Sequence, residues 1–321
     1  MGVGGKDGDV RASHRMTERI PPHLYFVGSA IFHYLGPSFA VLLFARVAVG
    51  GVAWLRIVSA GLVFAAWRRP WRAWLAADRP TRRLIAGLGV IFALMNYSFY
   101  VAIERLPLAT VAAIEFVGPI LLAAIGVRSS RNLAALGLAI VGVYLITDVR
   151  LAAEPAALAW AFANAALFTL YIVLAHRVSR SEAVSSPIDR LGASMLIAMI
   201  AITPLGLGGA LPALSDPVAL GAGIGVGLTS SVIPYVFDQM AMARLPRSTY
   251  ALFVALLPAT AVLIGLVVLG QVPTGLELAA VGFVIAGVLL HRDPAPAEEP
   301  PGRRSAAHDC SDHRSAGADE Q

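Results

Sequence analysis

Two stretches of the chain share one frame, RLPLATVAAIEFVGPILLAAIG at residues 105–126 and RLPRSTYALFVALLPATAVLIG at residues 244–265. They align without a gap and are identical at eight of 22 positions. Residues 133–145 and 278–290 form a second pair, identical at eight of 13 positions. The shared Arg-Leu-Pro-x-x-Thr run and the later proline are unusual in apolar segments, so they predict an internal duplication.

The composition indicates that the duplicated chain lies in a membrane. Its 321 residues are 57% hydrophobic and only 14% charged, with a mean hydropathy of +0.72. Soluble globular chains carry about 45–50% apolar and about 25% charged residues. This balance excludes soluble enzymes, secreted modules and nucleic-acid-binding proteins. The expected partners are therefore the lipid bilayer and a small-molecule substrate, and the sequence carries no signal for oligomeric state.

Ten apolar blocks lie between two polar ends, and each is close to the ~20 residues that cross a bilayer as a helix. The fold class predicted is an all-α polytopic membrane protein with ten transmembrane helices. Residues 1–23 are predicted to be a disordered leader, and residues 292–321 a disordered tail. The predicted spans are residues 24–44, 50–67, 83–103, 107–127, 132–147, 156–176, 190–208, 219–242, 247–269 and 274–291.

The matching stretches fall in the fourth and ninth blocks, and the second pair falls in the fifth and tenth. The repeat unit is therefore five spans, with one copy at residues 24–147 and the other at residues 156–291. An odd number of spans makes the second copy insert upside down. Inverted repeats are typical of secondary transporters that work by alternating access, so the sequence predicts a transporter.

The basic residues are distributed unevenly between the two sides of the predicted bundle. The side that holds both termini collects 21 of the 25 Lys and Arg residues, and the opposite side has three. Because positive residues accumulate in cytoplasmic loops, both termini are predicted to be cytoplasmic. Trp67, Trp71 and Trp74 flank the largest basic loop and are typical of a membrane–water interface. We assign most of these arginines to orientation and to lipid headgroup contact.

Charged side chains inside a span are costly and mark pathways or paired sites. The candidates are Arg56, Glu115 and Asp238, with Asn96 as a polar neighbour. Counting at 1.5 Å per residue places Arg56, Asn96 and Glu115 roughly 10–13 Å below the outer surface. Asp238 lies one turn from the cytoplasmic end.

Two interpretations of Arg56 and Glu115 remain open at this stage. They bind the carboxylate and the ammonium group of a zwitterion such as an amino acid, or they neutralise each other as a structural pair. Glu115 and Asp238 are also candidates for proton coupling. Protons are therefore a possible transported partner, and they would bind to the carboxylate of Glu115 or of Asp238.

Other residues of the spans are weaker candidates. Tyr97 and Tyr100 lie one turn apart and line a cavity or pack at an interface. Pro119 and Pro258 permit kinks that suit gating, while Asn164 is predicted to hydrogen-bond between helices. Close helix packing is predicted at four glycines: Gly137, Gly142, Gly282 and Gly287.

Motifs for chemistry are absent from the sequence. It has no phosphate-binding loop, no His-Glu-x-x-His, no Gly-x-Ser-x-Gly and no carboxylate cluster suited to Mg²⁺. We therefore expect neither an enzyme nor a cofactor or metal, and an ion or substrate gradient would supply the energy.

The stretch MNYSFYVAIERLPLATVAAIEFVGP at residues 95–119 resembles the EamA family of the drug/metabolite transporter superfamily. The likeness extends through residues 45–72 and 230–271 and is greatest to the threonine/homoserine exporter branch. It implies an inner-membrane exporter of small amino acids or related metabolites, with proton antiport as a candidate coupling. The matching motif positions in the first half are Arg56, Asn96, Glu115 and Pro119.

The second half departs from the family pattern at two places. Relatives often show Ser-Leu-Glu-Pro where this chain has Ala255-Leu256-Leu257-Pro258, and Gly-Glu where it has Gly270-Gln271. The carboxylates that relatives carry there are missing, which leaves ion coupling and substrate open. Efflux of drugs or of other metabolites is the alternative. An intramembrane enzyme or a non-transporting membrane protein is a further alternative that the inverted repeat and the absence of a catalytic constellation disfavour.

Overall fold

The computed structural model describes residues 21–126, 129–151, 154–180, 187–234, 237 and 257–290. Within these ranges the regular secondary structure is helical, with no strand assigned. All described residues belong to one compact unit, Met1–His291. Asp238, most of the predicted leader and the whole predicted tail lie outside the described residues.

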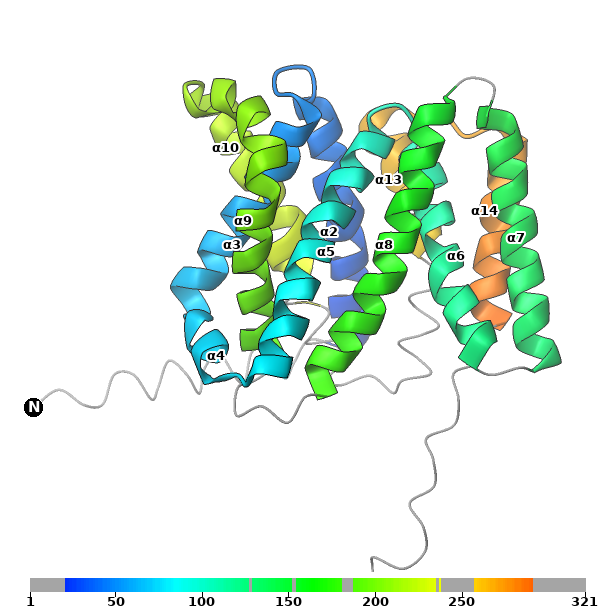
Figure 1. Cartoon of the computed structure of the whole chain (residues 1–321). Helices are drawn as coiled ribbons and strands as arrows, with labels where there is room; N and C mark the ends of the chain where they lie inside the picture. The colour runs from blue at the N-terminus through cyan, green and yellow to red at the C-terminus, as the bar shows by residue number, and fades with distance from the viewer. Residues whose placement is uncertain are drawn as a thin grey trace, which may run out of the picture. The chain divides into compact units, whose positions relative to one another are not determined.

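The helices follow the predicted blocks closely. The first part of the chain forms α2 (Pro22–Leu43), α3 (Val49–Arg68), α4 (Trp71–Ala76), α5 (Arg79–Ile103), α6 (Leu108–Gly126) and α7 (Ser130–Leu151) (Figure 1). The second part forms α8 (Pro155–Arg180), α9 (Pro187–Leu214), α10 (Pro217–Gly227), the π-helical turn η1 (Leu228–Val232), α13 (Leu257–Leu269) and α14 (Gly275–Leu290). Each predicted block overlaps one of these elements, and the short α4 in the basic loop was not predicted.

Length and apolar composition support a polytopic membrane protein. Among the described residues, five helices are long and apolar enough to cross a bilayer, namely α2, α3, α5, α8 and α9. Five further apolar segments of 10–17 residues lie in α6, α7, α10 with η1, α13 and α14. Large apolar side chains on the outside, such as Ile200 at 74% and Val267 at 71% exposure, suit contact with lipid.

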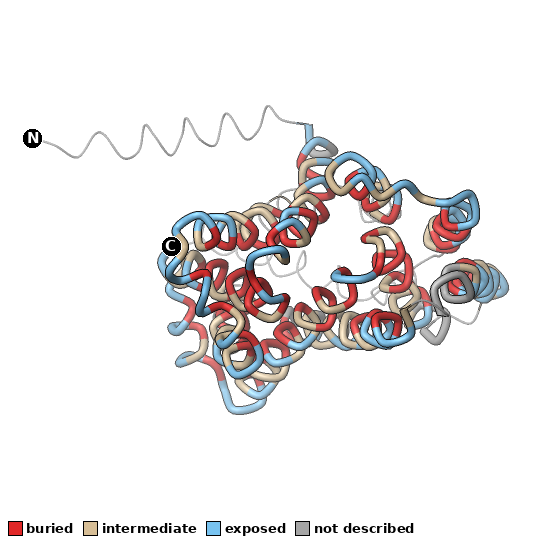
Figure 2. The backbone as a smooth tube through the Cα atoms, turned by 90° about the horizontal axis from the view of Figure 1, so that it is seen from above, coloured by how far each residue is buried: buried red, intermediate tan, exposed pale blue. Residues whose placement is uncertain are grey.

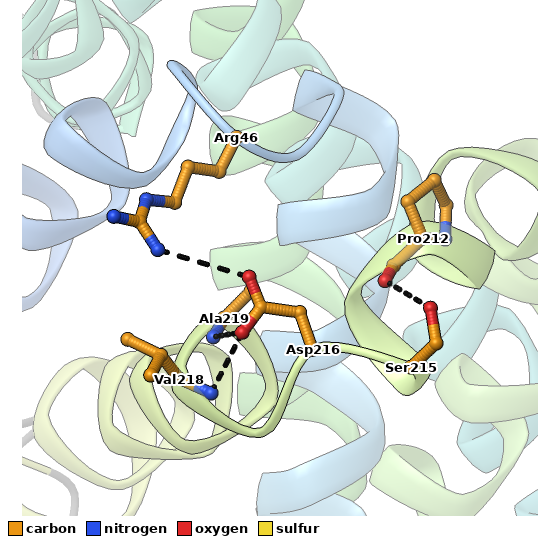
Figure 3. Close-up of polar contacts among 6 residues, drawn as sticks. All are labelled: Arg46, Pro212, Ser215, Asp216, Val218 and Ala219. Carbon is orange, nitrogen blue, oxygen red and sulfur yellow. Dashed lines mark hydrogen bonds and ion pairs between the residues drawn. The ribbon is translucent and has the colours of Figure 1, made fainter.

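Several helix starts are fixed by acidic side chains. The Asp78 carboxylate caps α5 by accepting a hydrogen bond from the Thr81 amide at 3.2 Å. Asp216 caps α10 by accepting from the amides of Val218 and Ala219 at 2.9 and 3.2 Å (Figure 3). Such caps satisfy amides that have no partner within the helix. These acids therefore set where the helices begin.

Helices distant in sequence pack against one another throughout the unit. α3 packs on α9, α7 on α14, and α6 on α13; α5 contacts both α8 and α9, and α10 contacts both α2 and α3. Figure 2 shows buried residues on the faces where the helices meet and exposed residues on their outer faces. The largest core cluster draws side chains from both parts of the chain, including Tyr34, Phe116 and Val284.

Glycines set the closest helix crossings. A Cβ on Gly142 would lie 2.6 Å from the Ala280 carbonyl oxygen, and one on Gly287 would lie 2.7 Å from the Ala135 carbonyl oxygen. The prediction of close packing is confirmed at these two positions. It is wrong for Gly137 and Gly282, where an added Cβ would meet no atom of the described residues within 4 Å. Five residues turn a helix by about 500°, which leaves the two glycines of one helix about 140° apart. They cannot both face the same neighbour.

Candidate substrate site

Arg56 of α3 is the centre of the candidate site. Its side chain is buried, at 7% exposure. Nε donates to the Ser231 hydroxyl at 3.1 Å, Nη1 to the Tyr100 hydroxyl at 3.3 Å, and Nη2 to the Ser230 carbonyl at 3.1 Å. The guanidinium carbon also lies 5.4 Å from the centre of the Tyr100 ring. All of these partners are neutral.

Arg56 is a buried cation without a counter-ion among the described residues. The ion pairs found there join other residues, on exposed or half-buried ends of helices. Removing an ion from water costs several kcal/mol, and neutral hydrogen bonds offset only part of that cost. A guanidinium presents donors in a planar fork that fits a carboxylate. Arg56 is therefore suited to bind an anionic group.

The π-helical turn η1 places two of the groups that hold Arg56. In this turn the Ile233 amide bonds back to the Leu228 carbonyl, which widens the helix by one residue. Widened turns of this kind are frequent at functional sites. The turn fits beside α2 and α3 because Gly36 and Gly227 lie too close to neighbouring atoms for a side chain.

The serines of η1 were missed in the sequence analysis. Hydroxyl residues are common in transmembrane segments, and no periodicity marks a π turn. The available signal was their place at the start of the second family-like stretch, residues 230–271. Ser231 accepts a hydrogen bond from Arg56, whereas the buried Ser230 hydroxyl lies against Gly36 and has no hydrogen-bond partner in the described part of the chain.

Glu115 of α6 forms the second part of the site. Its Oε1 accepts a hydrogen bond from Asn164 Nδ2 of α8 at 3.3 Å, so the predicted interhelical role of Asn164 is confirmed. The other amide atom, Asn164 Oδ1, is buried and has no hydrogen-bond partner among the described residues. Glu115 itself is partly exposed. A carboxylate with one neutral neighbour and an unsatisfied amide oxygen beside it can accept a donor-rich group such as an ammonium.

Arg56 and Glu115 are not paired directly in this structure. No ion pair of 4.0 Å or less joins them, although their charges attract each other over a longer distance. Tyr34 of α2, which is fully buried, lies within electrostatic range of Glu115 as well. The two charged side chains thus lie in one region without forming a direct ion pair. Each can therefore bind a charged group of a ligand.

Asn96 and Tyr97 have other partners. Asn96 is buried and its amide donates to the Phe92 carbonyl of its own helix at 2.8 Å. The Tyr97 ring packs edge-on against Trp160, with 6.0 Å between ring centres. Tyr100, three residues further on, contacts Arg56 instead. Three residues turn a helix by about 300°, so neighbouring tyrosines on roughly one face still meet different helices.

The remaining candidates are placed as follows. Pro119 is partly exposed within α6, and Pro258 is buried within α13. Gln271 accepts a hydrogen bond from the Leu108 amide at the start of α6 at 3.1 Å. A neutral amide satisfies that helix start. No group of His, Cys, Asp and Glu that could hold a metal occurs in the described part of the chain.

The chain is similar to known transporter proteins. Residues 155–292 match the model of the EamA-like transporter family. The threonine/homoserine exporter RhtA of Salmonella typhimurium (strain SL1344) is 30% identical over 267 residues, which cover 81% of this chain and 88% of the relative. The chain belongs to the EamA-like transporter family.

This EamA-like transporter is also similar to RhtA of Escherichia coli (strain K12), at 29% identity over 254 residues that cover 78% of this chain and 84% of the relative. The predicted resemblance to the threonine/homoserine exporter branch is therefore confirmed. A crystal structure of a protein with 19% identity aligns with a TM-score of 0.52 over 84% of this chain and 95% of the other, which supports the fold alone.

Proposed function

We propose that this EamA-like transporter is a secondary active exporter of small amino acids of the threonine/homoserine type in the cytoplasmic membrane. It works by alternating access between two inverted five-helix repeats, residues 24–147 and 156–291. The similar proteins named as threonine/homoserine exporters support the direction and the substrate class.

The packing of α7 on α14 supports the repeat. Gly142 approaches the Ala280 carbonyl, and Gly287 approaches the Ala135 carbonyl. The residues of each contact become those of the other when 145 is added to the α7 number and subtracted from the α14 number. Two copies of one unit related by a two-fold axis would make this reciprocal pair of contacts.

The pattern of helix contacts supports the same symmetry. Matching α2, α3, α5, α6 and α7 with α8, α9, α10, α13 and α14 gives several of the contacts a counterpart. The contact of α5 with α8 corresponds to that of α10 with α2, α5 with α9 to α10 with α3, and α6 with α8 to α13 with α2. The ten-helix arrangement with both termini in the cytoplasm follows from this repeat and from the 21 basic residues on one side.

The substrate site we propose is carried by the buried Arg56 without a counter-ion. Its guanidinium binds the substrate carboxylate, with Tyr100 holding it in place. Glu115 binds the substrate ammonium, and Asn164 orients the Glu115 carboxylate by its hydrogen bond. Asn96 and Tyr97 complete the walls of the pathway by supporting α5 rather than by touching the substrate.

Proton antiport is the coupling we propose, with Glu115 as the carrier. A carboxylate cannot hold a proton and an ammonium group at once, so release of one allows binding of the other. Asp238 serves as an exchange point near the cytoplasm, and Pro119 and Pro258 permit the helix bending that alternating access needs.

Efflux of threonine from cells that lack their own exporters tests this function. Cells are loaded with a threonine dipeptide, and efflux is compared among wild type, Arg56→Gln and Arg46→Gln at equal membrane abundance. Arg46 is a suitable control because its ion pair with Asp216 is long, at 3.7 Å, and exposed. Truncating one partner of a buried charge pair costs about 2–5 kcal/mol, so Arg56→Gln should lose efflux by at least about 30-fold.

Two results would change the assignment. Threonine efflux that survives Arg56→Gln would refute the carboxylate site. Wild-type cells that export drugs or other metabolites but neither threonine nor homoserine would establish the alternative substrate class. In proteoliposomes, threonine flux that ignores an imposed pH gradient would refute proton coupling.

A further inference from the structure

A second polar hollow lies at the C-terminal end of α3, about three helical turns beyond Arg56, and carries a different charge pattern. It has a volume of about 350 Å³ and is lined by the end of α3, the short α4 and the start of α9. Its polar lining consists of Arg68, Arg69, Arg72 and Asp189. Three cations and one anion leave a net positive charge in this hollow.

The cations of the hollow are not equivalent. Arg68 Nε lies 2.9 Å from Asp189 Oδ1, and the guanidinium stacks 5.7 Å from the Trp67 ring centre. Arg69 and Arg72 are exposed, and neither forms an ion pair with a carboxylate of the described residues. The hollow therefore offers two guanidinium groups to an anion, beside a third that is fixed by Asp189.

The backbone around these arginines is held in place. Arg69 ends α3 in the left-handed conformation, with φ of 49°, and turns the chain into α4. Gly192 of α9 allows Pro70 to approach, since a Cβ there would lie 3.0 Å from the proline ring. Arg82 then fixes the end of α4 by donating to the Trp74 and Leu75 carbonyls at 2.9 and 2.8 Å.

Exposed apolar side chains form a rim at and next to the hollow. Trp67 lines the hollow, while Trp71 and Leu75 belong to α4, which supplies part of its lining. Trp67, Trp71 and Leu75 are 57%, 44% and 67% exposed. Tryptophan is enriched where a protein meets the headgroup level of a membrane. A soluble phosphate would gain nothing from this rim, whereas acyl chains would cover it.

We propose that this hollow binds the phosphate group of an anionic phospholipid of the inner leaflet. Arg69 and Arg72 hold the phosphate oxygens, and the acyl chains lie over Trp67, Trp71 and Leu75. Basic pockets between transmembrane helices on the cytoplasmic side are suited to anionic lipid headgroups. The site is separate from the transport pathway and does not depend on the substrate proposed above.

Binding to the purified full-length chain in detergent tests the proposal, with native mass spectrometry counting bound phosphatidylglycerol or phosphatidylcholine. The test variant is Arg69→Asn combined with Arg72→Gln, because Asn tolerates the left-handed backbone. The control is Arg79→Gln with Arg83→Gln, which removes the same charge from exposed residues of α5 that do not line the hollow. Thermal unfolding checks that both variants fold.

Each arginine near an anionic surface changes binding by about fivefold. The test variant should therefore lose phosphatidylglycerol binding by roughly 10- to 30-fold, and the control by less than about threefold. Equal losses in both variants would mean diffuse attraction and would overturn the site. Inorganic phosphate that displaces the lipid at millimolar concentration would identify a soluble phosphate site and overturn the lipid assignment. If the double variant does not fold, Arg72→Gln alone should lose about fivefold, and an unchanged affinity would refute the proposal.

Discussion

Adding one methyl group to α7 tests the helix crossing and the internal symmetry together. In Gly142→Ala the new Cβ would lie 2.6 Å from the Ala280 carbonyl oxygen and 2.8 Å from Val284 Cγ2. Ordinary contacts begin at 3.4 Å, so the first approach is 0.8 Å too close. The nearer atom belongs to the backbone of α14, which cannot rotate away. The two helices must separate.

The matched control is Gly137→Ala in the same helix, since nothing lies within 4 Å of that position. Alanine is favoured over glycine in a helix by about 0.5–1 kcal/mol, and both variants receive this gain. Overpacking costs about 1–3 kcal/mol and affects Gly142→Ala alone. The free energies of unfolding of the two variants should therefore differ by about 1–3 kcal/mol.

Thermal unfolding of the purified variants in one detergent measures this difference. Gly142→Ala should unfold at least about 3 °C below Gly137→Ala. The repeat-related pair should behave alike, with Gly287→Ala less stable than Gly282→Ala, because Gly287 faces the Ala135 carbonyl and Gly282 faces open space. Equal unfolding temperatures within the α7 pair would refute the crossing, and a difference in one pair only would refute the symmetry.

Three further predictions concern single polar contacts. Ser231→Ala removes the acceptor of Arg56 Nε, and the unsatisfied charged donor should weaken threonine efflux by roughly 10-fold, whereas Ser231→Thr should keep it. Asp216→Ala should destabilise the protein by about 1 kcal/mol in thermal unfolding through loss of the α10 cap, while Arg46→Ala should cost under about 0.5 kcal/mol because its ion pair is exposed. Hydrogen bonding from Thr81 lowers the pKa of the Asp78 carboxyl, so its contribution to stability is present above the unfolded-state pKa and is lost as the pH falls through the folded-state pKa. Asp78→Asn should therefore flatten the acid side of the stability profile, and an unchanged profile would contradict this.

Local features of the sequence were sufficient to locate the helices of the described residues. A span needs only an apolar run of sufficient length, and each predicted block overlaps a helix. The six-residue α4 was missed because its length is far below a span and because it depends on the turn at Arg69 and Pro70. Such a turn is fixed by packing against Gly192, which composition cannot reveal.

The candidate site was predictable in its charges but not in its contacts. Counting residues from the ends of the spans placed Arg56 and Glu115 at a similar depth in the membrane. The free-energy cost of placing a charged side chain inside a span marked them as candidate functional residues. Their neighbours depend on which faces the helices turn toward each other. Tyr100 was named and contacts Arg56, whereas Asn96 bonds to its own helix. Ser231 was not named, because a π turn changes the face on which a residue lies.

The π turn η1 changes which face of the helix is directed toward Arg56. One extra residue in a turn sets the helix before it and the helix after it about 100° out of phase. The face of α10 that begins at the Asp216 cap is therefore not the face that meets Arg56. Deleting one residue of η1 would bring the two segments back into register and would turn the Ser231 hydroxyl away from the guanidinium. The extra residue of η1 thus orients the Ser231 hydroxyl toward Arg56.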